Sequence, residues 1–353
     1  MLIQSEVEVR APGGNYRIKI GEDLFPLVAS ETAASAWAQS CAVITDSNVA
    51  RICAPALMAE LEKSGCRAHM FEFPAGESNK TRQTKQSLED AMQEALLGRD
   101  CGVIALGGGV AGDVAGFVAA TYCRGVPYVQ VPTTLVACVD SAVGGKTGVD
   151  TPAGKNLVGA FHQPLAVYAD ISLLSTLPPR EIAMGIAEVI KYGVIKDPAL
   201  FEFLEKNVNA ATAGEPALLR KVVERSCAIK AAVVEKDERE SGLRKILNFG
   251  HTVGHAVEQL SGYAVGHGDA VAIGMVAEAE ISRKMGLMPE GDVKRIEKLV
   301  RAAGLQSELP AGMEESLCAA MKMDKKVRAG KIEMALPLRI GEMFAPEGEW
   351  GTV

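Results

Sequence analysis

Short apolar runs alternate with helical patterns through the first half of the chain, and this alternation constrains the fold more than any other feature. The apolar runs cover residues 41–45, 69–73, 101–106 and 126–131, and the helical patterns cover 49–64, 81–97 and 112–120. Strands separated by helices form βαβ units, whose strands pair in parallel. The first half therefore predicts a mainly parallel, Rossmann-like sheet covered by helices.

The second half carries long helical patterns and no run of buried strands before residues 332–336. The helical patterns cover residues 180–195, 216–235, 251–260, 269–285 and 292–303. The change comes near Leu177-Pro178-Pro179, in a chain of 353 residues, which is long enough for two domains. We expect an α/β N-terminal domain at residues 1–177 and a mostly α-helical C-terminal domain at residues 178–353.

The overall charge narrows the class of partner. With a net charge of -7, the chain lacks the basic balance of a general nucleic-acid binder, although a local cationic pocket for a small anion remains compatible with it. The most apolar window, residues 103–123, contains Asp113 and several glycines, which favours a strand, turn and helix over a membrane span. We therefore expect no membrane association and no nucleic-acid partner.

The cysteines and the N-terminus bear on the compartment. None of the 8 cysteines forms a C-x-x-C pair, and most lie in apolar runs, which favours buried free thiols in a reducing compartment. The first ten residues, MLIQSEVEVR, alternate like a strand and show no basic region followed by an apolar stretch. These features predict a cytoplasmic protein without a secretory signal.

A glycine-rich loop follows the apolar run at residues 101–106 and opens a helical pattern. Gly107, Gly109 and Gly112 fit the pattern G-x-G-x-x-G. Glycines let backbone N–H groups approach a pyrophosphate, whose charge the helix N-terminus favours. A tight turn with close helix packing would give the same pattern. No acid follows about 20 residues later, so the candidate ribose ligand is Asp46, after an earlier strand.

A second glycine cluster ends in Gly145-Lys146-Thr147, as a P-loop does. A P-loop also needs a glycine where this chain has Asp140, so hydrolysis of ATP or GTP is disfavoured. Lys146, Lys155 and Asn156 still form a candidate cradle for an anion.

Three of the 5 histidines fall within residues 251–267. His251 and His255 are four residues apart and share a helix face, which suits two metal ligands or one ligand and one acid–base group. His267 lies in a Gly-His-Gly turn that could bring it to the same point. Glu188, in an apolar helical segment, is the candidate carboxylate ligand, because a buried Glu needs a partner. Hydrogen-bonded histidines and a surface Glu remain the alternative.

Eight ordered segments resemble the 3-dehydroquinate synthases over nearly the whole chain. They are GESNK at 76–80, GGGVAGDVAGFVAA at 107–120, QVPTTL at 130–135, DSAVGGKTGVDTPAGKN at 140–156, TLP at 176–178, GIAEVIKYG at 185–193, KILNFGHTVGH at 245–255 and DKK at 324–326. Ala75, Asp269 and Leu173-Leu174 depart from the family's pattern, and none of them is a presumed ligand.

The resemblance implies a role for each matching position. It implies NAD binding by Asp46, Glu77, Lys80, Gly108, Gly109, Val110, Asp113, Thr133, Thr134, Lys146, Lys155 and Thr176. It implies a divalent metal, zinc or alternatively cobalt, on Glu188, His251 and His267. It implies substrate binding by Arg124, Lys146, Asn156, Lys230, Arg244, Asn248 and His255, with Arg124 reaching across a homodimer interface and one of Lys325 and Lys326 joining the set. General catalytic roles fall to Asp140, Lys146, Lys191, Glu240 and His255.

The activity that the resemblance implies is conversion of an anionic sugar phosphate, 3-deoxy-arabino-heptulosonate 7-phosphate, to 3-dehydroquinate and phosphate. The steps are oxidation by NAD, phosphate elimination, re-reduction and intramolecular aldol closure. A sister sugar-phosphate cyclase, a metal- and NAD-dependent polyol dehydrogenase and a non-catalytic binding protein are the alternatives. The cationic set Lys146, Lys191, Lys230 and Arg244 argues against a neutral polyol.

Overall fold

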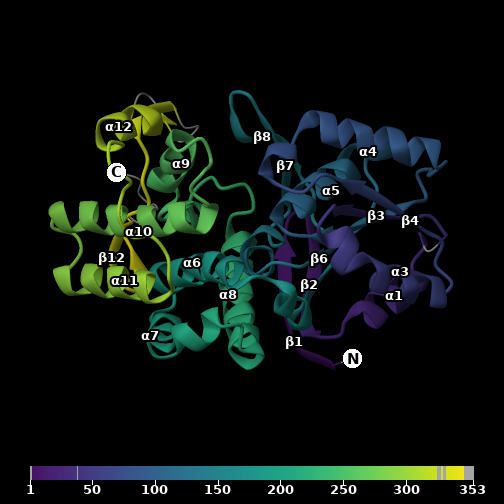
Figure 1. The fold of residues 1–353 in the computed structure, drawn as a ribbon, viewed down its shortest axis with the longest axis horizontal. Helices are drawn as coiled ribbons and strands as arrows, with labels where there is room; N and C mark the ends of the chain where they lie inside the picture. The colour runs from purple at the N-terminus through teal and green to yellow at the C-terminus, as the bar shows by residue number, and fades with distance from the viewer. Residues whose placement is uncertain (1, 38, 324–326, 329–330, 346–353) are drawn as a thin grey trace. The chain divides into compact units, whose positions relative to one another are not determined.

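The computed structural model describes every residue except 1, 38, 324–326, 329–330 and 346–353. It divides into two compact units, Met1–Leu177 and Pro178–Val353 (Figure 1). The first unit is built on a sheet and the second on helices.

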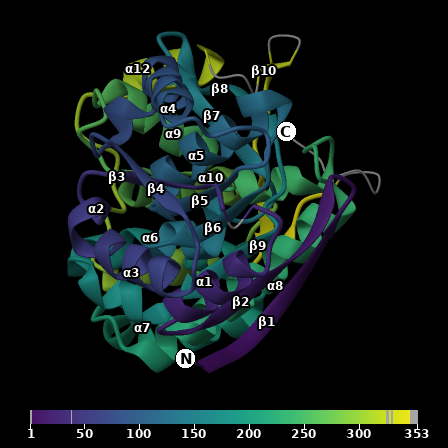
Figure 2. The same ribbon diagram turned by 90° about the vertical axis from the view of Figure 1, so that its right-hand side faces the viewer.

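A seven-stranded sheet forms the centre of the first unit, in the order β1-β2-β9-β6-β5-β3-β4. The strands are β1 (Leu2–Ala11), β2 (Gly14–Glu22), β3 (Cys41–Asp46), β4 (Ala68–Phe73), β5 (Gly102–Gly107), β6 (Tyr128–Pro132) and β9 (Ala166–Asp170). Only β1 runs antiparallel to its neighbour, and this long hairpin forms one edge of the sheet (Figure 2). The predicted fold class, a mainly parallel Rossmann-like sheet followed by a helical part, is confirmed.

Helices cover both faces of this sheet. They are α1 (Phe25–Ala33), α2 (Val49–Ile52), α3 (Ala54–Lys63), α4 (Arg82–Glu94) and α5 (Gly109–Thr121). Apolar residues of α1 and α3 pack on one face, and those of α4 and α5 pack on the other (Figure 1). The single helix expected at residues 49–64 is two helices, because Pro55 lies in the first turn of α3 and cannot donate a backbone hydrogen bond.

A hairpin that the sequence did not predict lies beside α5. It consists of β7 (Lys146–Thr151) and β8 (Gly154–Phe161), paired antiparallel. A Cβ at Gly116 on α5 would come within 2.5 Å of Thr147 Cγ2, so the hairpin packs closely on the helix. Short helices connect the remaining elements, namely η1 (Glu77–Asn79), η2 (Tyr122–Arg124), the π-helical η3 (Ala137–Ser141) and η4 (Ile171–Thr176).

The second unit consists mainly of helices. They are α6 (Pro179–Ile195), α7 (Pro198–Thr212), α8 (Pro216–Lys236), η5 (Leu243–Asn248), α9 (His251–Leu260), α10 (His267–Lys284), α11 (Glu290–Ala302) and α12 (Glu314–Met323). Two short hairpins accompany them, β10 (Val327–Arg328) with β11 (Lys331–Ile332), and β12 (Pro337–Arg339) with β13 (Glu342–Met343). The expected helical segments are present, and α7 and α12 are additions to them.

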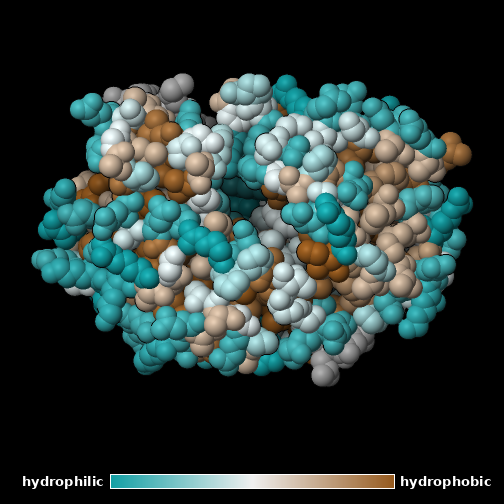
Figure 3. All heavy atoms as spheres, viewed as in Figure 1, coloured by the Kyte–Doolittle hydropathy of each residue, from teal (hydrophilic) through white to brown (hydrophobic). Residues whose placement is uncertain are grey.

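The surface and the thiols agree with a globular protein. Hydrophilic residues cover much of the face shown in Figure 3, with hydrophobic ones in small groups between them. Six of the eight cysteines are buried free thiols, as predicted, whereas Cys123 and Cys318 are exposed. Within the described residues, no helix is both long and apolar enough to span a bilayer.

Helices α9 and α10 approach each other so closely that their contact admits no side chain at Gly274. A Cβ at this position would lie 1.9 Å from the carbonyl oxygen of Gly250 and 2.9 Å from the amide nitrogen of Gly254. Because both atoms belong to the backbone, relief requires the helices to move apart.

We therefore predict that Gly274→Ala lowers the free energy of unfolding by about 1–3 kcal/mol. The matched control is Gly291→Ala in α11, where a Cβ meets nothing within 4 Å. This change should stabilise the protein by up to about 1 kcal/mol, the helix propensity gain of Ala over Gly. Urea unfolding followed by circular dichroism measures both, and equal stabilities would contradict the packing argument.

Candidate functional site

The predicted nucleotide ligands of the first unit gather where three neighbouring parallel strands end. Asp46 ends β3, Gly107 ends β5, and Thr133 follows β6. In the sheet register, Thr45 pairs with Leu106 and Gly107 pairs with Pro132, so these carboxyl ends lie side by side. Open parallel sheets bind their ligands at this edge.

Backbone geometry explains the glycines of the loop between β5 and α5. Gly107 has a φ of +155°, and a Cβ there would lie 2.5 Å from Ala111 Cβ and 3.3 Å from Asp46 Oδ2. A Cβ at Gly108 would lie 3.1 Å from Thr134 Cγ2. No side chain caps α5, which begins at Gly109, so its first-turn N–H groups can face an anion.

A buried lysine connects three elements next to this loop. Lys80 is 4% exposed, and its ammonium lies 2.5 Å from Asp113 Oδ2 on α5 and 2.6 Å from Asn156 Oδ1 on β8. Burial alone would lower the pKa of Lys80, but Asp113 and Glu77 raise it, so the lysine is held as a cation. Lys155 pairs with Glu77 at 3.2 Å. The structure thus brings together five of the predicted residues, namely Glu77, Lys80, Asp113, Lys155 and Asn156.

Further predicted residues of the first unit lie on or next to the short helices η2, η3 and η4 and strand β7. Thr176 donates to the Leu173 carbonyl at 2.7 Å, and Thr134 Oγ1 accepts from the Ala137 amide at 3.2 Å. Asp140 is half-buried in η3, and Lys146 is exposed at the start of β7. Arg124 is exposed after α5, with a φ of 71°.

The second unit brings Glu188, His251 and His267 to one point. Their ligand atoms all lie within 4.8 Å of one another. The Nε2 atoms of His267 and His251 lie 3.2 Å and 3.4 Å from the same oxygen of Glu188, Oε1. Glu188 comes from α6, and the histidines are the first residues of α9 and α10. Two imidazoles and one carboxylate match the three protein ligands of a known class of catalytic zinc site.

Glu188 is fully buried, so its charge needs compensation. Burial alone would raise its pKa, but the Lys191 ammonium and the His251 imidazole hold this pKa well below its usual range. Lys191 forms an ion pair with the second oxygen of Glu188. Burial has the opposite effect on a histidine, and it lowers the pKa of His251. For His267, hydrogen bonds to Glu188 and Glu258 outweigh burial and raise the pKa to about 10.

Each imidazole is also held from its other nitrogen. His251 Nδ1 lies 3.1 Å from the Phe249 carbonyl oxygen, and His267 Nδ1 lies 3.5 Å from Glu258 Oε1. Such contacts direct Nε2 of a ligating histidine toward its metal. Sequence reasoning missed Glu258, which is 3% exposed. The signal for it was a carboxylate in the apolar pattern of a helix that begins with a candidate ligand.

His255 lies beside this group and does not belong to it. Its ring centroid is 5.4 Å from that of His251, in an edge-on arrangement. The converging ligand atoms are those of Glu188, His251 and His267, so an acid–base role for His255 stays a prediction.

A cationic region adjoins η5, with buried Lys230 on α8 and buried Arg244 on η5. The Asp237 carboxylate accepts from the backbone amides of Ser241, Gly242 and Arg244 at 2.8–2.9 Å, and so fixes the loop that leads to η5. Asn248 donates to Glu240, which has a φ of 60°. Lys325 and Lys326 lie outside the described residues.

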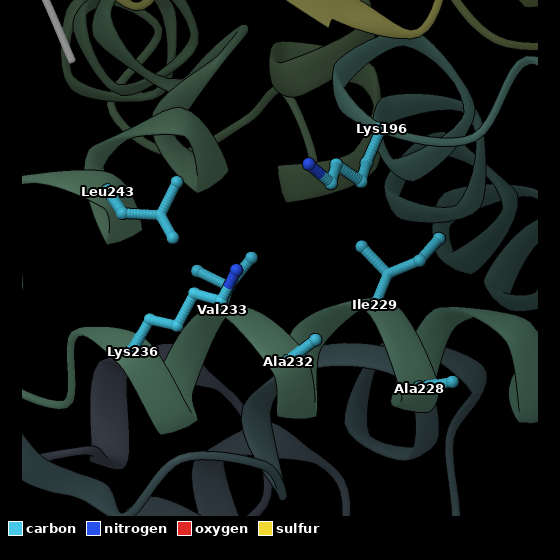
Figure 4. Close-up of a pocket in the computed structure, with 7 residues that line it drawn as sticks. All are labelled: Lys196, Ala228, Ile229, Ala232, Val233, Lys236 and Leu243. Carbon is cyan, nitrogen blue, oxygen red and sulfur yellow. The ribbon is translucent and has the colours of Figure 1, made fainter. Parts of the chain in front are cut away.

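A pocket of about 270 Å³ in the second unit contains none of the predicted site residues (Figure 4). Apolar side chains along α8 and Leu243 line it, and Lys196 and Lys236 extend toward it from opposite sides.

Two family models match the chain in succession. The 3-dehydroquinate synthase N-terminal model covers residues 70–184, and the C-terminal model covers residues 185–327. The 3-dehydroquinate synthase of Symbiobacterium thermophilum is 50% identical over 303 residues, which are 85% of this chain and 85% of that protein.

Solved structures of related cyclases have the same fold. A 2-deoxy-scyllo-inosose synthase complexed with carbaglucose-6-phosphate, NAD+ and Co2+ is 28% identical, with a TM-score of 0.90 over 99% of this chain and 96% of that chain. The 2-epi-5-epi-valiolone synthase of Streptomyces hygroscopicus subsp. jinggangensis, with NAD+ and Zn2+ bound, is 30% identical, with a TM-score of 0.86 over 93% of this chain and 91% of that chain. The family models, the relative and the matching motifs agree, and the chain belongs to the 3-dehydroquinate synthase family.

Proposed function

We propose that this chain is a 3-dehydroquinate synthase, which converts 3-deoxy-arabino-heptulosonate 7-phosphate to 3-dehydroquinate and phosphate with NAD and a divalent metal. The observation that carries the proposal is the convergence of Glu188, His251 and His267 on one point in a chain of this family. The relatives' activity and the cofactors bound to the related cyclases support it.

NAD is assigned to the carboxyl ends of β3, β5 and β6. The proposed ligands are those expected from the sequence, namely Asp46, Glu77, Lys80, Gly108, Gly109, Val110, Asp113, Thr133, Thr134, Lys146, Lys155 and Thr176. The loop glycines let the pyrophosphate approach the backbone, and the first turn of α5 supplies N–H donors. The Lys80–Asp113 pair keeps a positive charge fixed beside the loop.

The metal is assigned to Glu188, His251 and His267, with zinc or cobalt as the ion. A divalent cation fits this donor set because it would compensate the charge of the buried Glu188 between the two imidazoles. When bound, the metal would lower the pKa of a coordinated hydroxyl, as zinc lowers that of water from about 15.7 to about 7, and so ease hydride loss to NAD.

The remaining polar residues are assigned to the substrate. Arg244 and Lys230 suit its carboxylate, because both are buried cations. Lys146, Asn156, Asn248 and His255 are assigned to its phosphate, with Arg124 from the partner protomer of a homodimer. Asp140, Lys146, Lys191, Glu240 and His255 are assigned to catalysis. The buried free thiols support the proposal of a cytoplasmic location.

The chemistry explains why a carboxylate, imidazoles and fixed cations are required together. Oxidation places a ketone beside the C–H bond to be broken, so that the resulting carbanion is delocalised and phosphate can leave. Lys191 lies against Glu188 and keeps this carboxylate ionised for its role as a ligand. The cationic side chains assigned to the substrate's phosphate and carboxylate hold the substrate in one orientation while its ring opens and closes.

Incubation with the heptulosonate phosphate, NAD and zinc is the direct test. It should yield dehydroquinate and one phosphate per substrate, with no net NADH. A chelator should abolish phosphate release, and added zinc should restore it. Turnover of sedoheptulose 7-phosphate instead would transfer the chain to the sister cyclases, and steady NADH accumulation with a polyol would favour the dehydrogenase.

Removal of one ligand tests the metal assignment. His251→Ala should lose bound zinc and nearly all activity while circular dichroism shows an unchanged fold, because two ligands are too few to retain a catalytic metal. Metal content measured by atomic absorption decides the matter. A variant that still held one zinc per chain would refute the proposed ligand set.

Removal of a buried cation tests the substrate assignment. Lys230→Ala should raise KM by at least about tenfold, since a charge-assisted hydrogen bond contributes about 1.5–3 kcal/mol. Lys236→Ala on the same helix, at an exposed position, is the matched control and should leave KM unchanged. Steady-state kinetics measures both, and an equal KM for the two variants would argue against a substrate role for Lys230.

A further inference from the structure

Glu278 is a buried carboxylate on α10 with no role in the proposed chemistry. Its exposure is 0%. Its Oε2 accepts from the Gly250 amide at 2.7 Å, and its Oε1 accepts from the Thr252 and Val253 amides, both at 3.0 Å. One side chain therefore accepts hydrogen bonds from three backbone amides around the start of α9, those of Gly250, Thr252 and Val253.

These hydrogen bonds replace a cap that the sequence of α9 does not provide. The residue before α9 is Gly250, which has a left-handed backbone and no side chain to accept from the first turn. The first N–H groups of a helix need partners when they are buried, and a carboxylate also favours the positive end of the helix dipole. Glu278 meets both needs from a different helix.

The capped segment is the segment that positions His251. This histidine is the first residue of α9, and the amides on both sides of it donate to Glu278. Its Nδ1 contacts the carbonyl oxygen of Phe249, one residue before Gly250. A shift of this turn would therefore move the imidazole together with the backbone.

Glu278 also belongs to the helix that begins with the other imidazole. His267 is the first residue of α10, and Gly274 on α10 contacts the backbone of Gly250 and Gly254. The glycine contact sets how closely the two helices approach. The three hydrogen bonds set where the start of α9 lies along α10.

We propose that Glu278 is a positioning residue of the metal centre, which fixes the distance between the His251 and His267 imidazoles. The inference rests on the proposed function, because it requires that Glu188, His251 and His267 bind a divalent cation. Glu278 does not touch the metal or the substrate in this role, and it acts through the backbone of α9.

Glu278→Gln tests the inference, because the glutamine amide keeps the size of the side chain and replaces one acceptor oxygen with a donor facing backbone N–H groups. The matched control is Asp197→Asn. Asp197 caps α7 through the Leu200 amide at 3.0 Å and pairs with Arg225 on α8, and neither helix carries a proposed metal ligand. Both variants lose a carboxylate that caps a helix, but only the Glu278 cap is on the backbone next to a proposed metal ligand, His251.

The measurement is titration of the metal-free chains with Co2+, by visible absorption and by competition with a chelator, alongside urea unfolding of the same metal-free chains. We expect Glu278→Gln to bind Co2+ about 10–100-fold more weakly, with an altered ligand-field spectrum. Asp197→Asn should lose stability yet keep the wild-type affinity and spectrum.

Wild-type affinity and spectrum in Glu278→Gln would overturn the inference, and so would equal weakening in both variants, which would show a general stability effect. A wild-type chain that bound no Co2+ would instead refute the metal site of the proposed function, and this inference with it. If Glu278→Gln does not fold, Glu278→Asp decides, because it keeps the charge and shortens the reach. Unchanged Co2+ affinity in that variant would overturn the inference.

Discussion

Glu188 lies fully buried on α6, between the Lys191 ammonium and the imidazoles of His251 and His267. An isolated carboxylate in such a position would cost several kcal/mol, so the surrounding cations are a condition for this part of the molecule to fold. Lys191 supplies one charge from the same helix. The remaining compensation comes from α9 and α10, and a divalent cation can provide it as well as a protonated imidazole does.

This requirement links the packing of the second unit to its chemistry. The imidazoles can converge on Glu188 only if α9 and α10 begin at the same place, and both helices begin with a histidine. Gly250, Gly254 and Gly274 permit the close approach, and Glu278 completes the start of α9. Glu258 then contacts His267 from the side opposite Glu188. Most of these residues serve the position of the ligands and touch no substrate.

The first unit has a different proposed task, which is to bind the pyrophosphate of NAD with backbone N–H donors. Its parallel strands β3, β5 and β6 end side by side, so residues far apart in the sequence meet at one edge without long-range side-chain contacts. The Lys80 ammonium, held between Asp113 and Asn156, ties this edge to the β7–β8 hairpin. The hairpin was not predicted, because the glycines and polar residues of this segment were interpreted as a loop that binds an anion.

The sequence alone determined the parallel sheet and the helical second half, because hydrophobic periodicity is a local property that survives without a structure. The full set of one carboxylate and two imidazoles was expected only from the resemblance to the family. The tertiary structure decided what depends on contacts between distant segments. It placed His255 edge-on beside His251, Glu258 beside His267 Nδ1, and Glu278 at the start of α9. The apolar pattern around Glu258 is a weak signal of its burial, since the packing of α9 on α10 is what removes both carboxylates from water and brings their partners within reach.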